Sequence, residues 1–248
     1  MTLHSFFAEN SRVALAFSGG VDSAYLLYAA KAAGADVTAY YVKSAFQPEF
    51  ELRDARRLAT ELGAKMSVLE LDVLCDSAVT ANPPERCYHC KKKIFTAIAE
   101  AAKRDGYELL IDGTNASDDA ADRPGIRALR ELSVRSPLRE CGITKQQVRM
   151  LSREAGLFTW DKPAYACLAT RIPTGESITA EKLQKTEKAE EHLETLGFRD
   201  FRVRLVGSSA KLQVREDQLP LLIAKRNEIL AGLKPLYSDI LLDLEVRG

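Results

Sequence analysis

Short apolar runs alternate with helix-forming segments along the first two thirds of the chain. Runs with the length and composition of buried parallel strands occupy residues 13–17, 37–42, 66–71 and 109–111, and residues 134–138 resemble a short fifth strand. Segments rich in helix formers or in apolar residues at helical spacing occupy residues 24–33, 49–62, 91–103 and 144–155. This alternation predicts an α/β fold: a three-layer, doubly wound parallel sheet that binds its ligand at the carboxyl ends of the strands.

The last third of the chain follows a different pattern. Helices are predicted at residues 180–196 and 219–231, and strands at 201–206, 210–214 and 236–244. This order is typical of a small α+β domain. Because Pro173 and Gly175 interrupt the pattern between the two regions, we expect an α/β domain over residues 1–172 and an α+β domain over residues 178–248.

The turn between the first strand and the first helix has the sequence S-G-G-V-D-S, from Ser18 to Ser23. Gly19 and Gly20 let the backbone approach an anion closely, and the N–H groups of the new helix point at the same place. Asp22 would repel a phosphate unless a cation lay between them, so the turn predicts a magnesium ion that bridges Asp22 and a nucleotide. The signatures G-x-x-x-x-G-K-[ST] and G-x-G-x-x-G are absent, which disfavours P-loop kinases and dehydrogenases.

Two further segments reach the same edge of the predicted sheet. Lys43 ends the second strand and would lie beside the phosphate turn. The fourth strand is followed by an acidic, hydroxyl-rich loop that begins at Asp112, in which Asn115 and Asp118 are candidates for contacts with nucleotide or magnesium. The alternative is a solvated loop whose Asn and Asp side chains cap a helix.

Composition narrows the classes of function. The 248 residues include 35 Lys plus Arg and 35 Asp plus Glu, so the chain has no excess of positive charge that would indicate nucleic-acid binding. No apolar run approaches the length of a membrane span, and the first ten residues lack the basic start and apolar core of an export signal. We therefore expect a cytoplasmic homo-oligomer with a small-molecule partner, no nucleic acid and no membrane.

Five cysteines in such a chain favour reduced thiols with a chemical use over a disulfide framework. Cys87 and Cys90 form a C-x-x-C pair at the start of a predicted helix, where the helix dipole favours thiolate. Cys167 lies in an aperiodic segment, residues 160–171, that is expected to be a functional loop. A zinc site, a redox dithiol and a [4Fe–4S] cluster with one open iron all remain as interpretations. Two other cysteines are expected to be ordinary core residues, Cys75 and Cys141.

Together these motifs resemble the LarE type of ATP-dependent sacrificial sulfur transferase, within the PP-loop ATP pyrophosphatases. The resemblance spans residues 10–180 and rests on S-G-G-V-D-S, N-P-P-x-x-C-Y-x-C-K, D-G-T-N-x-S-D, R-P-G-I-R-A-L-R-E-L, S-P-L-R-E and W-D-K-P-A-x-A-C-L-A-T-R. It implies that ATP adenylates a carboxylate of pyridinium-3,5-biscarboxylic acid mononucleotide, with release of pyrophosphate and AMP. Sulfur then forms a thiocarboxylate on the way to a nickel-pincer nucleotide cofactor.

The resemblance also implies roles for single residues. Cys167 occupies the sulfur-bearing position and, with Asp22, is assigned to catalysis. Nucleotide binding is assigned to Ser18, Gly19, Gly20, Asp22, Ser23, Lys43 and Asn115. Magnesium is assigned to Asp22 and Asp118. In family members with the C-Y-x-C pair, three thiolates hold a [4Fe–4S] cluster that carries a transferable sulfide, which assigns Cys87, Cys90 and Cys167 to the cluster. In single-cysteine members, the residue at this position gives up its own sulfur and becomes dehydroalanine. We favour the cluster version.

Positively charged side chains are needed to bind the phosphate and the second carboxylate of such a substrate. Guanidinium groups pair with either in a two-pronged way, so the candidates are Arg127, Arg130 and Arg171. Each has the alternative of being a surface arginine. Other functions that fit the motifs are a PP-loop tRNA thiolase, an amide-forming ligase of the NAD synthetase kind and a non-enzymatic thiol or metal-binding module.

Overall fold

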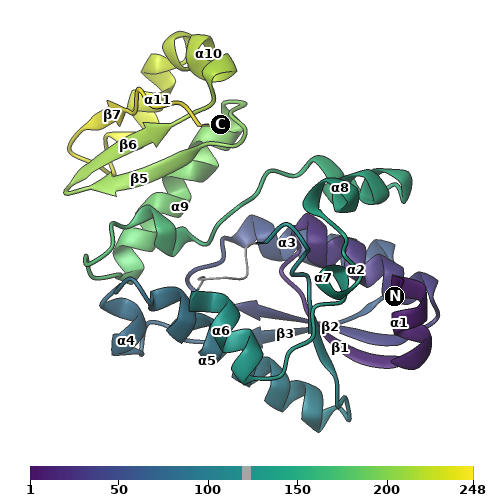
Figure 1. The fold of residues 1–248 in the computed structure, drawn as a ribbon. Helices are drawn as coiled ribbons and strands as arrows, with labels where there is room; N and C mark the ends of the chain where they lie inside the picture. The colour runs from purple at the N-terminus through teal and green to yellow at the C-terminus, as the bar shows by residue number, and fades with distance from the viewer. Residues whose placement is uncertain (119–123, 248) are drawn as a thin grey trace. The chain divides into compact units, whose positions relative to one another are not determined.

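The computed structural model describes residues 1–118 and 124–247, and its internal contacts divide the chain into two units (Figure 1). The first unit comprises residues 1–73 and 85–162, and the second comprises residues 74–84 and 163–248. The contacts thus place residues 163–172 with the second unit. The domain limits expected from the sequence, 1–172 and 178–248, stay a prediction.

The first unit is built on a four-stranded parallel sheet. Its strands are β1 (Arg12–Ala16), β2 (Asp36–Lys43), β3 (Lys65–Glu70) and β4 (Leu110–Asp112). Their order is β3-β2-β1-β4, and every neighbouring pair is parallel. Successive residues of β1 face opposite sides of the sheet, so Val13 and Leu15 enter one apolar cluster whereas Ala14 enters another.

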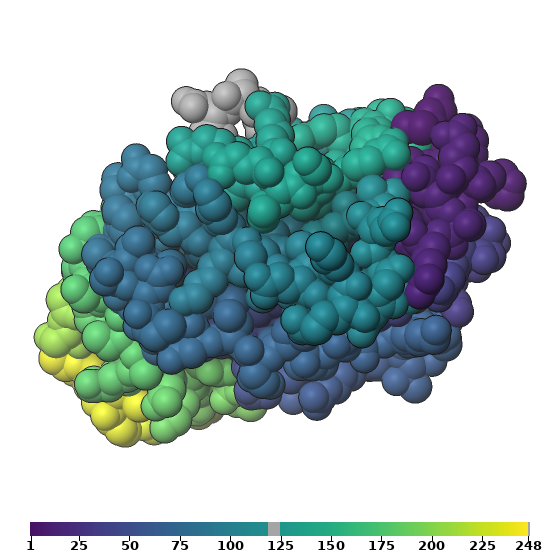
Figure 2. Space-filling model, turned by 90° about the horizontal axis from the view of Figure 1, so that it is seen from below, coloured from purple at the N-terminus to yellow at the C-terminus, as the bar shows by residue number. Residues whose placement is uncertain are grey.

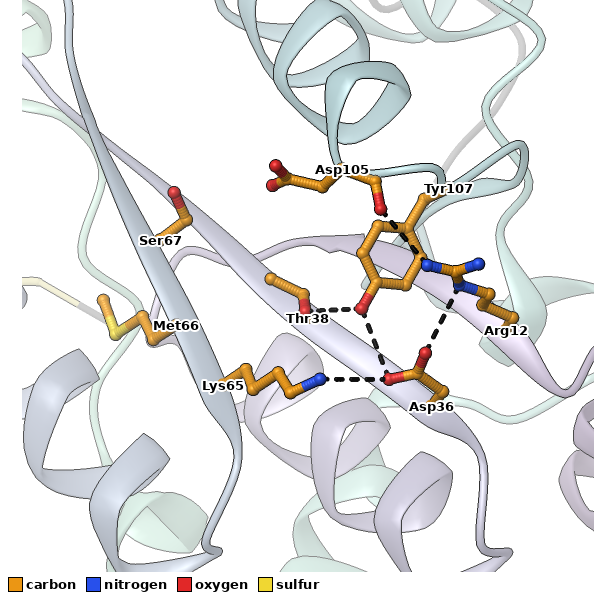
Figure 3. Close-up of a pocket in the computed structure, with 8 residues that line it drawn as sticks. All are labelled: Arg12, Asp36, Thr38, Lys65, Met66, Ser67, Asp105 and Tyr107. Carbon is orange, nitrogen blue, oxygen red and sulfur yellow. Dashed lines mark hydrogen bonds and ion pairs between the residues drawn. The ribbon is translucent and has the colours of Figure 1, made fainter.

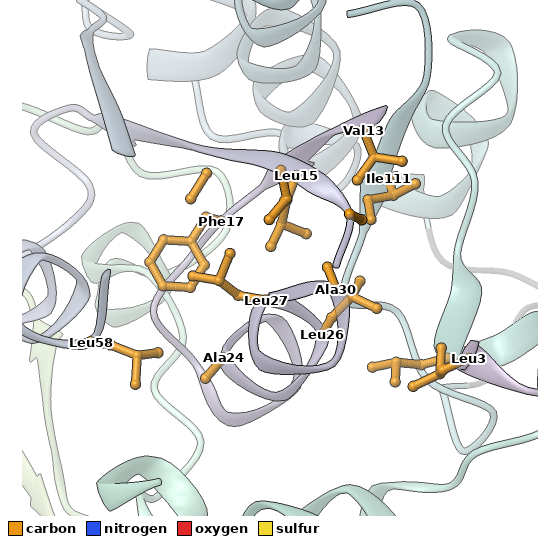
Figure 4. Close-up of a cluster of buried hydrophobic side chains, with 14 of the residues drawn as sticks. Leu3, Val13, Leu15, Phe17, Ala24, Leu26, Leu27, Ala30, Leu58 and Ile111 are labelled. Carbon is orange, nitrogen blue, oxygen red and sulfur yellow. The ribbon is translucent and has the colours of Figure 1, made fainter. Parts of the chain in front are cut away.

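Helices cover both faces of this sheet. They are α1 (Leu3–Glu9), α2 (Val21–Ala32), α3 (Glu49–Glu61), α5 (Arg86–Arg104), α6 (Pro124–Glu131), α7 (Pro137–Glu140), α8 (Lys145–Glu154) and the 3-10 turn η1 (Phe158–Asp161). On one face, Leu27 of α2 and Leu58 of α3 pack around Leu15 and Phe17 (Figure 4). On the other face, α5 contributes residues such as Phe95. The predicted three-layer α/β fold is confirmed.

The helix α1 was not expected from the sequence. The Ser5 backbone N–H donates to Thr2 Oγ1 at 3.1 Å, and the Thr2 N–H donates to Ser5 Oγ at 2.9 Å. These reciprocal bonds form a capping box, which satisfies two donors at the helix start. Phe6 and Phe7 anchor the helix in the core, and Figure 2 shows the purple α1 beside teal residues of the same unit.

Residues 134–138 do not form the expected fifth strand. One parallel bridge joins Arg135 to Ile111, and the Asp112 N–H donates to the Arg135 carbonyl at 2.9 Å. Pro137 then begins α7, because proline lacks the N–H that a further ladder bond requires and its fixed φ suits a first helical turn. The strand prediction is therefore wrong beyond Arg135.

The second unit is the expected small α+β structure. Its elements are α4 (Ser77–Thr80), η2 (Leu168–Arg171), α9 (Ala180–Thr195), β5 (Arg202–Val206), β6 (Ser209–Gln213), η3 (Glu216–Gln218), α10 (Leu219–Ala224), α11 (Arg226–Leu233) and β7 (Ile240–Leu242). The strand β6 pairs antiparallel with β5 and parallel with β7. Leu193 of α9 and Leu233 of α11 pack with Leu212 in one apolar cluster.

Two predicted elements of this unit are shorter than expected. The helix predicted over residues 219–231 is divided between α10 and α11 at Lys225, whose φ of −94° and ψ of 12° depart from helical values. The strand predicted over residues 236–244 is reduced to β7. Its first residues instead complete the turn after α11, because the N–H groups of Leu236 and Tyr237 donate to the Leu233 carbonyl at 2.9 and 3.0 Å. Within the described part of the chain, no helix has the length and apolar character that a membrane span requires.

Candidate active site

The phosphate turn is an open loop braced by its own serines. Gly19 has a φ of 72°. Gly20 is the N-cap residue of α2, and no side chain among the described residues caps the N–H groups at the start of that helix. Ser23 Oγ donates to the Gly20 carbonyl at 3.2 Å and accepts from the Ser18 N–H at 3.3 Å. Ser23 therefore holds the shape of the turn, while the start of α2 provides N–H groups for an anion.

The conformation and surroundings of Gly19 both require glycine. A Cβ added there would lie 3.1 Å from the Cβ of Ala55 on α3. Gly34 has a similar φ of 76°, but a Cβ there would meet nothing within 4 Å. The two positions thus share the backbone strain and differ in crowding.

We expect Gly19→Ala to lower the free energy of unfolding by about 2–4 kcal/mol, from left-handed strain plus overpacking. Gly34→Ala carries the strain alone, about 1–2 kcal/mol. Urea denaturation measures both, and calorimetry should show weakened ATP binding for Gly19→Ala only. Equal losses of stability and unchanged ATP binding in the two variants would contradict this interpretation of the turn.

Asp22 is the centre of a polar cluster formed by three elements. It lies in the first turn of α2 and accepts a hydrogen bond from Asn115 Nδ2, with 3.2 Å between Nδ2 and Oδ1. Its other oxygen, Oδ2, lies 2.5 Å from Nζ of Lys145, the first residue of α8. Both ends of this ion pair keep some exposure, 35% for the lysine side chain and 21% for the aspartate. The lysine was not identified from the sequence.

The loop after β4 is fixed tightly against the start of α2. A Cβ at Gly113 would lie 2.8 Å from the Ser23 backbone nitrogen, so only glycine permits this approach. The Asn115 N–H donates to Asp118 Oδ2 at 3.1 Å, and Asn115 Oδ1 accepts from the Ser117 N–H at 2.8 Å. Asn115 is only 2% exposed. The structure thus brings Asn115 to Asp22, whereas Asp118 is seen closing its own loop, and its magnesium role stays a prediction.

Lys43 contacts the loop that leads to α3. Its Nζ donates to the Gln47 carbonyl at 2.6 Å and lies 2.6 Å from Oε1 of Glu49. The structure shows no bond between Lys43 and the phosphate turn among the described residues. Its predicted contact with nucleotide stays a prediction.

Cys87 and Cys90 lie one turn apart at the start of α5, the former exposed and the latter buried. Residues three apart share one face of a helix. Tyr88, which lies between them in the sequence, packs against α6. The guanidinium carbon of Arg127 lies 3.9 Å from the centre of the Tyr88 ring, and the Tyr88 hydroxyl donates to Glu131 Oε2 at 2.8 Å. This contact holds the start of α5, which carries both cysteines, against α6.

The three candidate substrate arginines have different surroundings. Arg127 stacks on Tyr88 while its side chain stays 60% exposed, and Arg130 is exposed at the end of α6. Arg171, in the second unit, is 1% exposed and pairs with Glu190. Substrate contacts by these residues stay predictions.

Cys167 lies in the second unit, half-buried at the start of η2. In the same unit, the buried Asn82 donates from Nδ2 to the Pro173 carbonyl at 2.8 Å, and its own carbonyl accepts from the Gly175 N–H at 2.9 Å. Asn82 therefore joins residues 74–84 to residues 173–175 within the second unit. Sequence reasoning treated N-P-P only as a motif and missed this link.

The other two cysteines have no comparable setting. Cys75 is exposed in a turn before α4, so the expectation that it is a core residue is wrong. Cys141 is half-buried and packs against the main apolar cluster, as expected. Burial raises the pKa of the Cys141 thiol, which disfavours thiolate there.

The donor types fit the expected metals. The carboxylate of Asp22 suits magnesium, whereas Asn115 directs its amide nitrogen to Asp22 and its amide oxygen to the Ser117 N–H. The thiols of Cys87, Cys90 and Cys167 suit iron. Across residues 1–118 and 124–247, no three His, Cys, Asp or Glu side chains form a preassembled metal site. Assignment of magnesium and iron therefore stays a prediction from donor chemistry.

A cavity of about 300 Å³ lies at the opposite edge of the sheet, among residues that begin β1, β2 and β3 (Figure 3). Its polar groups bond to one another: the Tyr107 and Thr38 hydroxyls are 2.7 Å apart, and Asp36 lies 3.3 Å from Arg12. Ligands of doubly wound folds bind at the carboxyl ends of the strands, so this cavity is not the nucleotide site.

Comparison with known proteins shows several relatives of this chain. The family model described as queuosine biosynthesis protein QueC matches residues 12–170. An uncharacterized protein of Synechocystis sp. is 39% identical over 219 residues, which is 88% of this chain and 81% of that protein. The pyridinium-3,5-bisthiocarboxylic acid mononucleotide synthase of Lactiplantibacillus plantarum is 34% identical over 220 residues, 88% of this chain and 80% of that protein. A tRNA-specific 2-thiouridylase MnmA of Frankia alni is 30% identical over 189 residues, 61% of this chain and 53% of that protein.

Proposed function

Because the chain belongs to the QueC family of PP-loop proteins and is a homologue of the Lactiplantibacillus plantarum synthase, we propose that it is an ATP-dependent sulfur transferase. Its substrate is pyridinium-3,5-biscarboxylic acid mononucleotide, one carboxylate of which becomes a thiocarboxylate. The observation that carries the proposal is the cluster of Asp22, Asn115 and Lys145 beside the phosphate turn.

A carboxylate is a poor electrophile, and joining it to AMP supplies a good leaving group. The N–H groups at the start of α2 bind the phosphates, and Lys145 provides a positive charge within reach of the same place. Magnesium, when bound, neutralises the charge that develops on the departing pyrophosphate. Asp22 would hold it, with Asp118 as the second predicted ligand, and Lys145 pairs with Asp22 beside the start of α2.

The sulfur step is assigned to Cys167. A thiolate or sulfide attacks the acyl adenylate, the carbon–oxygen bond to AMP breaks, and AMP leaves. We assign Cys87, Cys90 and Cys167 to a [4Fe–4S] cluster, which when bound supplies an iron site for a transferable sulfide. The support is the donor chemistry of the three thiols. In the alternative route the Cys167 thiolate forms a thioester, and cleavage of its Cβ–Sγ bond then gives the thiocarboxylate and leaves dehydroalanine at position 167.

The nucleotide products test the first half of the proposal. Purified protein incubated with ATP, magnesium and the biscarboxylate mononucleotide should release AMP and pyrophosphate only when the mononucleotide is present, as chromatography can show. Formation of ADP and phosphate would contradict the proposal. Release of AMP that depends on tRNA instead of the mononucleotide would favour the function named for the thiouridylase relatives.

A further inference from the structure

The backbone around Cys167 is held in a tight turn. The Cys167 carbonyl accepts from the Thr170 N–H at 3.0 Å and from Thr170 Oγ1 at 2.9 Å, which closes the turn η2. The Arg204 guanidinium donates from Nη1 to the Thr170 carbonyl at 2.9 Å. Residues 164–171 therefore have one defined conformation in the second unit, and Cys167 lies within it.

The Arg171 guanidinium contacts this turn from the inside. Its Nη1 donates to the Ala166 carbonyl and to Thr170 Oγ1, both at 2.8 Å, so it bonds to groups on both sides of Cys167. Its Nε and Nη2 donate to the two oxygens of Glu190 at 2.8 and 3.0 Å. With Arg171 only 1% exposed, its bonding capacity is directed to the protein itself.

Glu190 connects the turn to the rigid part of the unit. It lies on α9, is 5% exposed, and its carboxylate accepts from the Tyr165 hydroxyl at 2.6 Å and from the Val203 N–H of β5 at 3.0 Å. Hydrogen bonds to a buried charge are strong, and an unpaired buried charge is costly. The carboxylate thus ties three segments together.

Charges around this pair explain why an acidic residue is needed. Burial alone would lower the pKa of Arg171, but its hydrogen bonds to Glu190 raise that pKa overall, so the guanidinium stays charged. Burial and the charges of Arg171 and Arg247 lower the pKa of Arg202 to about 10. Glu190 therefore balances a group of crowded cations.

We propose that Glu190 and Arg171 are positioning residues that fix the backbone of Cys167 for sulfur transfer. The inference rests on the proposed function. Neither side chain is open to solvent, so both act through the turn, and the contact of Arg171 with substrate predicted from the sequence is not needed for its role.

The test compares Glu190→Gln with Glu181→Gln in the full-length protein. Glu181 is on the same helix, and its Oε1 pairs with Lys185 at 2.7 Å on an exposed face. In Glu190→Gln, amide hydrogen exchange in residues 164–171 should accelerate about tenfold or more, because charge-assisted bonds to the turn are lost. Sulfur transfer should fall about 10- to 100-fold while mononucleotide-dependent release of pyrophosphate stays near that of the parent protein. Glu181→Gln should change neither quantity.

A second variant separates positioning from stability. The double replacement Glu190→Leu with Arg171→Met removes both partners of the ion pair at once, which should cost less stability than removing either partner alone. Fast exchange in residues 164–171 and slow sulfur transfer in this folded variant would support the proposal. Parent-like exchange and transfer in both folded variants would overturn it. If the parent protein transfers no sulfur, the proposed function fails, whereas the exchange measurement still decides whether the pair holds the turn.

Discussion

Replacing Cys167 with alanine is expected to abolish sulfur transfer, with a loss of about 1,000-fold or more, because the variant lacks the attacking thiolate or, in the cluster version, one of the three thiolates that would hold the cluster. Formation of the acyl adenylate should persist, since the phosphate turn and the Asp22 cluster belong to the first unit. Two measurements separate these steps. Isotope exchange between pyrophosphate and ATP follows adenylation, and mass spectrometry of the mononucleotide follows sulfur incorporation.

The matched control is Cys75→Ala, which removes an exposed thiol from the same unit. It should leave both steps unchanged. Normal sulfur incorporation by Cys167→Ala would contradict the assignment. Loss of iron from Cys87→Ala, Cys90→Ala and Cys167→Ala alike, measured after anaerobic reconstitution, would support the cluster. Dehydroalanine at position 167 after one turnover, seen in the intact mass, would instead establish the sacrificial route.

The second large effect is expected at Asp22. Asp22→Asn should slow mononucleotide-dependent release of pyrophosphate by about 100- to 1,000-fold, because the carboxylate that holds magnesium against the phosphates is lost. The amide is nearly the same size and still accepts from Asn115, so the fold should persist. Rates measured over a magnesium titration should show that excess metal does not restore the parent rate.

Asp36→Asn is the control for this substitution. Asp36 also pairs with a lysine, with 3.7 Å between its Oδ1 and Nζ of Lys65, but it begins β2 at the opposite edge of the sheet. Asp36→Asn should lower the free energy of unfolding only slightly, because exposed ion pairs contribute little to stability. It should leave the rate of pyrophosphate release unchanged. Equal rates for Asp22→Asn and the parent protein would remove Asp22 from the proposed mechanism.

The sheet and the phosphate turn could be predicted because their signals are local. Apolar runs of strand length mark β1, β2 and β3, and the S-G-G-V-D-S turn combines glycines, hydroxyls and a helix start within six residues. Local signals also misled where two of them competed. The segment at residues 134–138 resembled a short strand, but Pro137 favoured a helix start and prevailed.

The rest of the site depends on contacts between distant residues. Lys145 begins α8 and meets Asp22 only because the loop after β4 packs against α2 through Gly113. Glu190 reads as one of several acidic residues on an amphipathic helix, and only its burial beside Arg171 distinguishes it. Such pairings leave no periodicity or short motif in a single sequence.

The central claim is tested most directly by the fate of the mononucleotide. Protein prepared anaerobically is incubated with ATP, magnesium and pyridinium-3,5-biscarboxylic acid mononucleotide. The mass of the mononucleotide is measured by mass spectrometry, and the AMP released is quantified in the same samples. The account predicts that sulfur replaces one carboxylate oxygen in step with AMP release. A mononucleotide that is unchanged, or that gains nitrogen in place of sulfur, would contradict it.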